Sequence, residues 1–356
     1  MKRLFICNTY MQLIMAVHMK LTLFKDDETD LWLSDCSNGA TEVAKRLQNT
    51  HLFRDVKLKI WNNKFYTQSP IYDIWDVFSY SFTTLNIKTI DFYDEILFYN
   101  PILDIFAISD YYRQKKHHVK WSCFDEGIFS YNTNLIGGKR YKLCRLIRNM
   151  TMRYDPFLHI SAFYCMFPQL KTTHLDWELI LVPSIEEDKD KLINVLNAVF
   201  DFYPLNLPQY IYFASSSDID GNPYGETEFV LKLANLLGKN NFIVKTHPRD
   251  KRSIFQDYSI KTLQESYIPW EVIQLNMNTT SNVLLTLTSG SFISITAMMN
   301  EQGKNIKGYF LYNTHNWNSH YYTNRCKEIK SQLDKLHKSG LCLNLRDNIS
   351  IIDNLK

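Results

Sequence analysis

Short, almost wholly apolar runs alternate with amphipathic stretches along nearly the whole chain. In the first half the apolar runs are residues 2–7, 30–34, 56–61, 95–99 and 119–124. Residues 9–23, 41–48 and 102–112 lie between them and have helical patterns. Strands that are apolar on both faces and are separated by helices indicate a parallel sheet covered on both sides. The pattern therefore predicts an α/β fold.

The second half repeats this alternation, with strand-like runs at 179–182, 210–214, 242–245, 283–287 and 308–311. Helical patterns cover residues 187–200 and 227–237. A chain of 356 residues is long enough for two domains. We expect two Rossmann-like domains, 1–183 and 184–340, that face a central cleft. Residues 341–356 are expected to form a helix that packs back on the first domain.

Composition excludes several classes of protein. A net charge of +3 is too small for a typical nucleic-acid binder. No apolar run is long enough to cross a membrane. The seven cysteines include no Cys-x-x-Cys pair, which favours reduced thiols in a cytoplasmic protein and no metal site. The basic, apolar N-terminus is interrupted by Asn8, Thr9 and Gln12, so it predicts a strand, a turn and a helix rather than a signal peptide.

Ligands of open parallel sheets bind beyond the carboxyl ends of the strands. Asp125, Glu126 and Gly127 directly follow the apolar run 119–124. Two neighbouring carboxyls in poorly solvated surroundings can raise the pKa of one of them, which then serves as a base, and Gly127 permits a sharp turn. The alternative is a surface turn that caps the next segment.

A second group follows the run 242–245. Lys245, His247 and Arg249 are three potentially cationic side chains, and Pro248 restrains His247 to an extended backbone. Such a group suits an anion such as a phosphate, and a histidine can also protonate a leaving group. The alternative is a basic surface loop.

Three further places have polar residues at the ends of strands or the starts of helices. Thr288, Ser289 and Ser291 precede a helix expected at 292–299, where they either hold an anion or act as N-caps. Glu271 either binds a ribose diol or complements a helix dipole. Thr9 and Gln12 either face the cleft or belong to a plain N-cap.

The Asp218-x-Asp220 sequence has the form that many metal-dependent sugar transferases use. It lies in a turn-rich loop after a strand. We interpret it as a sequence that lines the cleft without binding metal.

The order of these pieces resembles that of the bacterial sialyltransferases of the two-lobed type. These include family 52 glycosyltransferases, the capsular polysialyltransferases and the Pasteurella-type enzymes. The shared order is an acid-acid-Gly motif, a His-Pro motif ~120 residues later and a Ser/Thr pair ~40 residues after that. Thr-x-x-Gln-Leu from Thr9 and Ile-Pro-Trp-Glu-Val before and after Glu271 also look like family 52.

The resemblance implies a GT-B glycosyltransferase architecture and an inverting, metal-independent sialyltransferase. It would move sialic acid from CMP-sialic acid, with no other cofactor, to a hydroxyl of a bacterial capsule or lipooligosaccharide. Asp125 would be the general base, and His247 would contact the departing phosphate.

By the same resemblance, Thr288, Ser289 and Ser291 would hold the phosphate, and Glu271 the ribose. In some family 52 members the base comes from the loop nearer the His-Pro motif, which here offers Asp218 and Asp220.

Two other functions stay open: a transferase for another donor, such as a UDP-hexose, and a non-catalytic carbohydrate-binding protein. The segment 138–153 carries six basic residues and no acid. Through Lys139, Arg140, Arg145 and Arg148 it would contact an anionic membrane and a lipid-linked acceptor, unless it is a solvated helix face. A homodimer is also left open.

Overall fold

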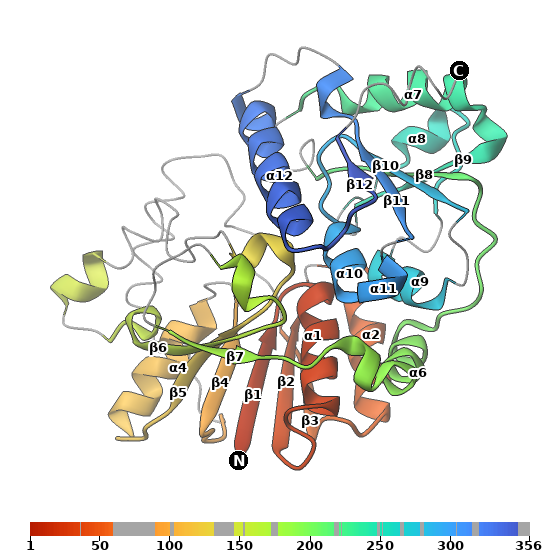
Figure 1. Ribbon diagram of the computed structural model, residues 1–356. Helices are drawn as coiled ribbons and strands as arrows, with labels where there is room; N and C mark the ends of the chain where they lie inside the picture. Colours follow the sequence, from red (N-terminus) through yellow and green to blue (C-terminus); the bar gives the residue numbers. More distant parts are fainter. Residues whose placement is uncertain are drawn as a thin grey trace. The chain divides into compact units, whose positions relative to one another are not determined.

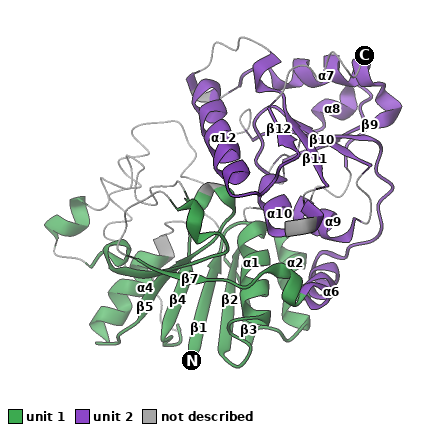
Figure 2. Cartoon of the chain, in the orientation of Figure 1, with its two compact units in different colours: residues 1–188 green, residues 189–356 purple. Residues whose placement is uncertain are grey.

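The computed structural model describes residues 1–35, 37–59, 90–99, 103–131, 146–151, 154–171, 177–216, 221, 223–247, 250, 252–263, 267–277, 281–303, 305–314 and 320–347. The chain divides into unit 1, Met1–Asp188, and unit 2, Lys189–Lys356 (Figure 2). The sequence predicted a boundary at 183/184. The segment up to Asp188 stays with unit 1 because His18 Nε2 bonds to the Pro183 carbonyl at 2.8 Å and Lys25 Nζ lies 3.4 Å from Asp188.

The described residues of unit 1 form a seven-stranded parallel sheet in the order β3-β2-β1-β4-β5-β6-β7 (Figure 1). The strands are β1 (Lys2–Cys7), β2 (Glu28–Ser34), β3 (Asp55–Lys59), β4 (Glu95–Phe98), β5 (Lys120–Phe124), β6 (Ile160–Cys165) and β7 (Glu178–Leu181). The chain runs outward from β1 to β3 and then returns to place β4 beside β1. Such a reversal is where ligands bind in doubly wound sheets.

The described helices of unit 1 include α1 (Tyr10–Leu21), α2 (Ala40–Asn49) and α4 (Leu103–Gln114), with short 3-10 turns at Ile128–Tyr131, Pro156–His159, Pro168–Leu170 and Ile185–Glu187. Helix α1 begins shortly after β1, which lies between β2 and β4. Thr9 is its N-cap, and its hydroxyl accepts a hydrogen bond from the Gln12 backbone N–H at 3.2 Å.

The described residues of unit 2 form a five-stranded parallel sheet in the order β12-β11-β10-β8-β9. The strands are β8 (Tyr210–Phe213), β9 (Phe242–Lys245), β10 (Val283–Thr286), β11 (Lys307–Phe310) and β12 (Leu345–Arg346). The order reverses between β8 and β10, so the second expected ligand position lies after these two strands. The predicted α/β class with two Rossmann-like units is confirmed.

The helices of unit 2 are α6 (Lys189–Phe200), α7 (Glu226–Leu237), α8 (Ile254–Asp257), α9 (Trp270–Asn276), α10 (Ile293–Met298), α11 (Asn300–Gly303) and α12 (His320–Lys338), with 3-10 turns at Lys239–Asn241 and Tyr312–Thr314. Residues 341–347 are not helical, so the expected C-terminal helix does not include them: Leu345 is fully buried in β12, where it pairs with Gly308 of β11. Residues 348–356 lie outside the described residues.

Arg148 corrects part of the expected membrane contact. Its side chain is only 1% exposed: Nη2 donates to Asp110 Oδ1 at 2.6 Å, and the guanidinium lies 4.3 Å from the centroid of the Phe106 ring. Arg148 therefore does not face a lipid surface. Neighbouring Leu146 and Met150 are exposed, whereas residues 139–145 lie outside the described residues.

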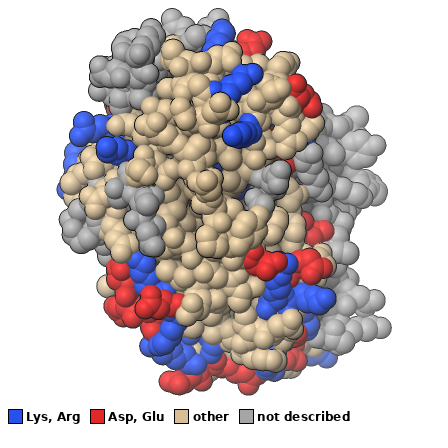
Figure 3. All heavy atoms as spheres, turned by 90° about the vertical axis from the view of Figure 1, so that its right-hand side faces the viewer, with Lys and Arg blue, Asp and Glu red and all other residues tan. Residues whose placement is uncertain are grey.

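Three further observations concern the classes of protein that composition excluded. No helix among the described residues is both long and apolar enough to span a bilayer. On the face shown in Figure 3, acidic and basic side chains are interspersed. The described cysteines are free, and all but Cys326 are buried.

Candidate functional site

The acid pair of unit 1 lies where β5 ends. The Asp125 backbone N–H continues the ladder to β6 by donating to the Tyr164 carbonyl at 2.9 Å. Gly127 has φ +117°, a value that L side chains rarely adopt, and the 3-10 turn Ile128–Tyr131 follows it. The sequence correctly required a glycine at this turn.

Asp125 is buried at 3% exposure and its carboxylate is occupied by neighbours. Oδ1 accepts hydrogen bonds from Gly127 N at 2.7 Å and from Ser130 Oγ at 2.9 Å, and Oδ2 accepts one from the Tyr131 hydroxyl. Burial raises the pKa of Asp125, and these three donors oppose the rise. Asp125 thus caps the turn from inside the protein. It has the raised pKa that the sequence predicted for one acid of the pair, and it also has the capping role that the sequence offered as the alternative.

Glu126 has different surroundings. Its residue is partly exposed, yet its Oε2 atom is buried and accepts no hydrogen bond from the described residues. Burial raises the pKa of Glu126 to about 7, the Gln12 side chain opposes this, and the Asp125 charge adds to it. A carboxyl that titrates near neutrality can exchange a proton at physiological pH.

Gln12, near the start of the helix α1 that follows β1, is the neighbour of this pair from another part of the sheet. It is fully buried in α1, and its Oε1 accepts a hydrogen bond from the Asn8 backbone N–H at 2.5 Å. Its Nε2 group has no hydrogen-bond partner among the described residues. The Gln12 side chain nevertheless lies close enough to Glu126 to lower its pKa. The Thr9 hydroxyl is the plain N-cap that the sequence offered as the alternative.

In unit 2, Lys245 and Glu271 come together. Lys245 is 4% exposed at the end of β9, and Glu271 lies in the first turn of α9. Burial raises the pKa of Glu271 to about 7, and its own backbone N–H and the Lys245 charge oppose the rise. The pair gives unit 2 one cation and one titrating acid at the same sheet edge.

His247 follows Lys245 and lies beside an acid that sequence reasoning missed. Asp250 N–H donates to the His247 carbonyl at 2.8 Å. Burial raises the pKa of Asp250, but bonds from Arg252 at 2.8 Å, with a smaller pull from His247, lower it overall. The sequence signal that could have indicated this group is the presence of Asp250 and Arg252 in the same loop as His247. Pro248 and Arg249 lie outside the described residues.

The hydroxyls after β10 belong to two separate groups. Ser289 Oγ and Ser291 Oγ lie 2.8 Å apart, and Ser289 N–H donates to Thr286 Oγ1 at 2.9 Å. The N-cap of α10 is Phe292, which makes no side-chain capping bond. The serines therefore do not cap this helix through their side chains.

Thr288 belongs to a chain of hydrogen bonds that crosses from β10 to β8. Its Oγ1 lies 2.8 Å from the Tyr224 hydroxyl, which donates to Ser215 Oγ at 2.6 Å. Ser215 Oγ donates to Glu226 Oε2 at 2.6 Å, and the Tyr212 hydroxyl donates to Glu226 Oε1 at 2.8 Å. Sequence reasoning missed this chain because its members are far apart in the sequence and form no motif.

Asp218 and Asp220 lie outside the described residues. The part of the chain that the structure describes holds no group of three or more His, Cys, Asp or Glu side chains that could bind a metal ion.

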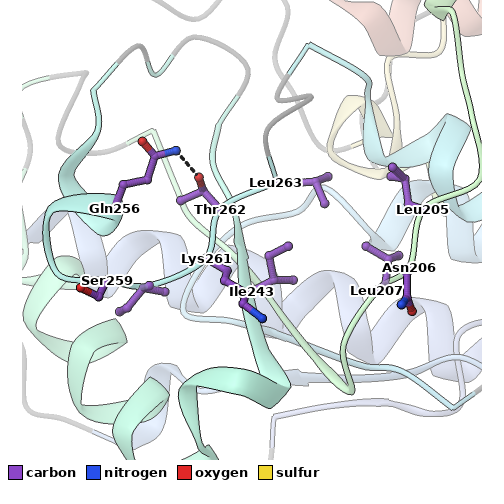
Figure 4. Close-up of a pocket in the computed structure, with 10 residues that line it drawn as sticks. Leu205, Asn206, Leu207, Ile243, Gln256, Ser259, Lys261, Thr262 and Leu263 are labelled. Atoms are coloured by element: carbon purple, nitrogen blue, oxygen red, sulfur yellow. Dashed lines mark hydrogen bonds between the residues drawn. The ribbon is translucent and has the colours of Figure 1, made fainter.

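A pocket of about 630 Å³ lies in unit 2 away from these residues (Figure 4). Its walls come from the segment before β8, which includes Leu205 and Leu207, and from residues 256–263 beside β9. Gln256 Nε2 donates to Thr262 Oγ1 at 2.7 Å on its rim. None of the predicted site residues lines it, so its mainly aliphatic surface is not the candidate site.

No protein-family model and no curated protein sequence matches the chain. Solved structures are similar to it at low identity. The Photobacterium phosphoreum α/β-galactoside α-2,3-sialyltransferase is 9% identical with a TM-score of 0.49, over 92% of this chain and 95% of that one. The Methanocaldococcus jannaschii UDP-GlcNAc 2-epimerase in complex with UDP-GlcNAc and UDP is 11% identical with a TM-score of 0.47, over 87% and 84%.

Arabidopsis thaliana UGT89C1 complexed with UDP is 12% identical with a TM-score of 0.47, over 87% of this chain and 80% of that one. These identities and scores identify neither a family nor a reaction.

Proposed function

We propose that the protein is a GT-B glycosyltransferase that moves sialic acid from CMP-sialic acid to a hydroxyl of a bacterial capsule or lipooligosaccharide. The observation that supports it best is the contrast between two sheet edges. Unit 2 has the cationic side chains Lys245 and His247 where its parallel strands end, together with hydroxyls and the acid Glu271, whereas the corresponding edge of unit 1 has the two carboxyls Asp125 and Glu126. Transfer from an anionic donor needs both kinds of group.

The donor lies on unit 2 in this proposal. Lys245 and His247 neutralise the phosphate of CMP, and the Ser289 and Ser291 hydroxyls donate hydrogen bonds to it. Glu271 binds the ribose diol. His247 protonates or stabilises the phosphate of CMP as CMP departs. This leaving group has a single phosphate, so no metal ion is needed to bridge a diphosphate.

The acceptor lies on unit 1. One carboxyl of the pair Asp125–Glu126 removes the proton from the acceptor hydroxyl, whose oxygen attacks the anomeric carbon in a single inverting displacement. The resemblance implies Asp125 for this role, with Asp218 or Asp220 as alternatives. Membrane contact is not part of the proposal, because Arg148 is held inside the protein by Asp110.

The test is the release of CMP and the transfer of sialic acid in the presence of EDTA. We expect turnover by the wild type and a loss of about 10²–10⁴-fold in His247→Ala. His118→Ala, which changes an exposed histidine of unit 1, is the matched control and keeps wild-type activity.

Three results would correct the proposal. Turnover of a UDP-sugar but not of CMP-sialic acid changes the donor and leaves the architecture. Glycan binding without turnover of any nucleotide sugar indicates a carbohydrate-binding protein. Full activity in His247→Ala removes the histidine from the donor site.

A further inference from the structure

The pocket of unit 2 beside β9 has a size that suits a ligand, and none of the residues assigned to the donor lines it. Its volume of about 630 Å³ lies within the range of about 300–1,000 Å³ that small-molecule sites usually have. The pocket is therefore a second place in unit 2 where a small molecule can be held.

One wall of the pocket is a segment that adds to the edge of the sheet at β9, the last strand in the sheet order. Val244 N–H donates to the Lys261 carbonyl, and Leu263 N–H donates to the Val244 carbonyl, both at 2.9 Å. Val244 and Thr262 thereby form a parallel bridge. This wall is fixed to the sheet whether or not a ligand is bound.

The opposite wall is the segment 205–207, which lies between two prolines. Pro204 and Pro208 fix the backbone φ on either side of this segment. Asn282 Nδ2 donates to the Pro208 carbonyl at 2.7 Å. Because both walls are held by the rest of unit 2, the pocket is preformed and a ligand needs to order little of the protein.

The apolar part of the lining is accessible to solvent. Leu205, Leu207 and Ile243 line the pocket and are only partly buried. In the close-up, Leu263 of one wall lies across from Leu205 of the other (Figure 4). An aliphatic chain between these walls removes its own apolar surface and theirs from water, which favours binding.

The polar part of the lining, among the residues that the structure describes, has one cation and no acid. Lys261 is exposed and supplies the ammonium group. Gln256 Nε2 donates to Thr262 Oγ1 at 2.7 Å, so the Thr262 hydroxyl can donate its own proton to a ligand. One cation together with hydroxyl donors complements a single negative charge.

Ser259 adds a second hydroxyl at a position that favours glycine. Its φ is +58°, in the left-handed region, and it directly follows the C-cap of α8. Ser259 N–H donates to the Gln256 carbonyl at 2.8 Å, and Ile260 N–H donates to the Phe255 carbonyl at 3.0 Å, which is the Schellman arrangement. Glycine would adopt this backbone with less strain, so the serine keeps a side chain in the pocket lining against the local preference.

From these features we propose that the pocket binds a small amphipathic anion, an aliphatic chain that ends in one carboxylate. The chain lies between Leu205, Leu207 and Leu263, and the carboxylate accepts hydrogen bonds from Lys261 and Ser259. The site does not depend on the proposed transferase reaction.

The experiment is calorimetric titration of the full chain with octanoate and with octanol at pH ~7.5. We expect one octanoate to bind per chain, about tenfold or more tighter than octanol, because only octanoate carries the charge that Lys261 complements. Each CH₂ removed from the carboxylate should weaken binding by about two- to fourfold.

Three variants test the assigned contacts. Lys261→Met should weaken octanoate binding by about tenfold and leave octanol binding within about twofold. Lys330→Met, at an exposed lysine of α12 that does not line the pocket, is the matched control and should change neither. Ser259→Gly should weaken octanoate binding by about three- to tenfold, with a midpoint of thermal unfolding no lower than that of the wild type.

The absence of saturable octanoate binding to the wild type overturns the proposal. Equal affinities for octanoate and octanol, or an equal loss in Lys261→Met and Lys330→Met, overturn it as well. Binding to anionic vesicles without binding of free octanoate replaces the small ligand with a membrane surface. None of these results bears on the transfer of sialic acid, which the assay of CMP release tests separately.

Discussion

Asp125 of unit 1 and Asp250 of unit 2 are both buried aspartates in a turn that follows a parallel strand. Asp125 is 3% exposed and Asp250 is 9% exposed, and each accepts several hydrogen bonds. Their pKa shifts nevertheless have opposite directions. The donors that oppose the rise at Asp125 are the Tyr131 and Ser130 hydroxyls and the backbone N–H groups of Gly127 and Met166, and burial still raises its pKa. At Asp250 the Arg252 guanidinium outweighs burial and lowers the pKa.

The opposite directions have two physical causes: Asp125 is more deeply desolvated, and only Asp250 has a charged donor. At the acids of unit 1, burial raises the pKa of both carboxyls, and the Asp125 charge raises that of Glu126 further, so the protonated form is favoured there. The corresponding edge of unit 2 carries Lys245, His247 and Arg252 near its strand ends. It therefore suits the retention of an anion, which agrees with the acceptor and donor positions proposed for the two units.

The largest expected effect is the loss of stability when each aspartate is removed. Asp125→Ala leaves Gly127 N–H, the Ser130 hydroxyl and the Tyr131 hydroxyl without their acceptor, which should cost about 3–5 kcal/mol. Asp250→Ala should cost about 1 kcal/mol, because the Arg252 side chain is 41% exposed and water replaces the lost acceptor.

The free energies of unfolding in urea measure both losses. Equal losses of stability in Asp125→Ala and Asp250→Ala would contradict the comparison. They would mean that the exposure of the donor left behind does not affect the free energy of unfolding. Asp125→Asn, which keeps one carbonyl oxygen, should fall between the wild type and Asp125→Ala.

A smaller effect is expected in the pH dependence of stability. The pKa of Glu126 is raised to about 7 in the folded protein, against 4.5 for the unconstrained group, so the folded state binds more protons between these values. Its charge therefore reduces stability as pH rises through this window. Glu126→Gln should be more stable than the wild type by about 1–3 kcal/mol at pH 8 and no different at pH 4.

Asp250 should show the opposite sign. Its pKa is lowered in the folded protein, so its contribution is present above the unfolded pKa of 3.8 and is lost as pH falls below it. Urea unfolding of Asp250→Asn at pH 7 and pH 2 measures this. A gain in stability at pH 7 would contradict the assigned role of Arg252.

The smallest expected effect concerns the hydrogen-bond chain of unit 2. Tyr224→Phe removes the hydroxyl between Ser215 and Thr288, so Thr288 loses the partner that orients it. We expect the donor KM to rise by about three- to tenfold with kcat nearly unchanged, the cost of one hydrogen bond. Tyr258→Phe, at an exposed tyrosine of the same unit, should change neither constant; an equal effect in both would remove the chain from the donor site.

Most strands of both sheets were predictable because each is short, apolar and followed by a helical pattern or a turn. Sequence analysis missed β6, although Ile160–Cys165 is almost wholly buried, and it missed β12, which has only two residues. The segment 138–153 between β5 and β6 was interpreted as a membrane-contacting segment or a solvated helix face, and the next strand was not sought directly after it. The length of β12 is too short for any periodicity to appear.

The candidate site was predictable in part. The positions of Glu126, Lys245 and Glu271 followed from the rule that polar residues after parallel strands face a ligand. Tyr224 and Glu226 were not predictable, because their partners Thr288 and Ser215 reach them only when β8 and β10 become neighbours.

The sequence by itself determined the α/β class, the two units and the places where chemistry is concentrated. Those properties follow from the local alternation of apolar and polar residues, which is visible in short stretches of the sequence. Tertiary structure alone decided the surroundings of the two acids Asp125 and Glu126. The Tyr131 hydroxyl reaches Asp125 and the Gln12 side chain reaches Glu126 only because β1 and β5 lie in the same sheet.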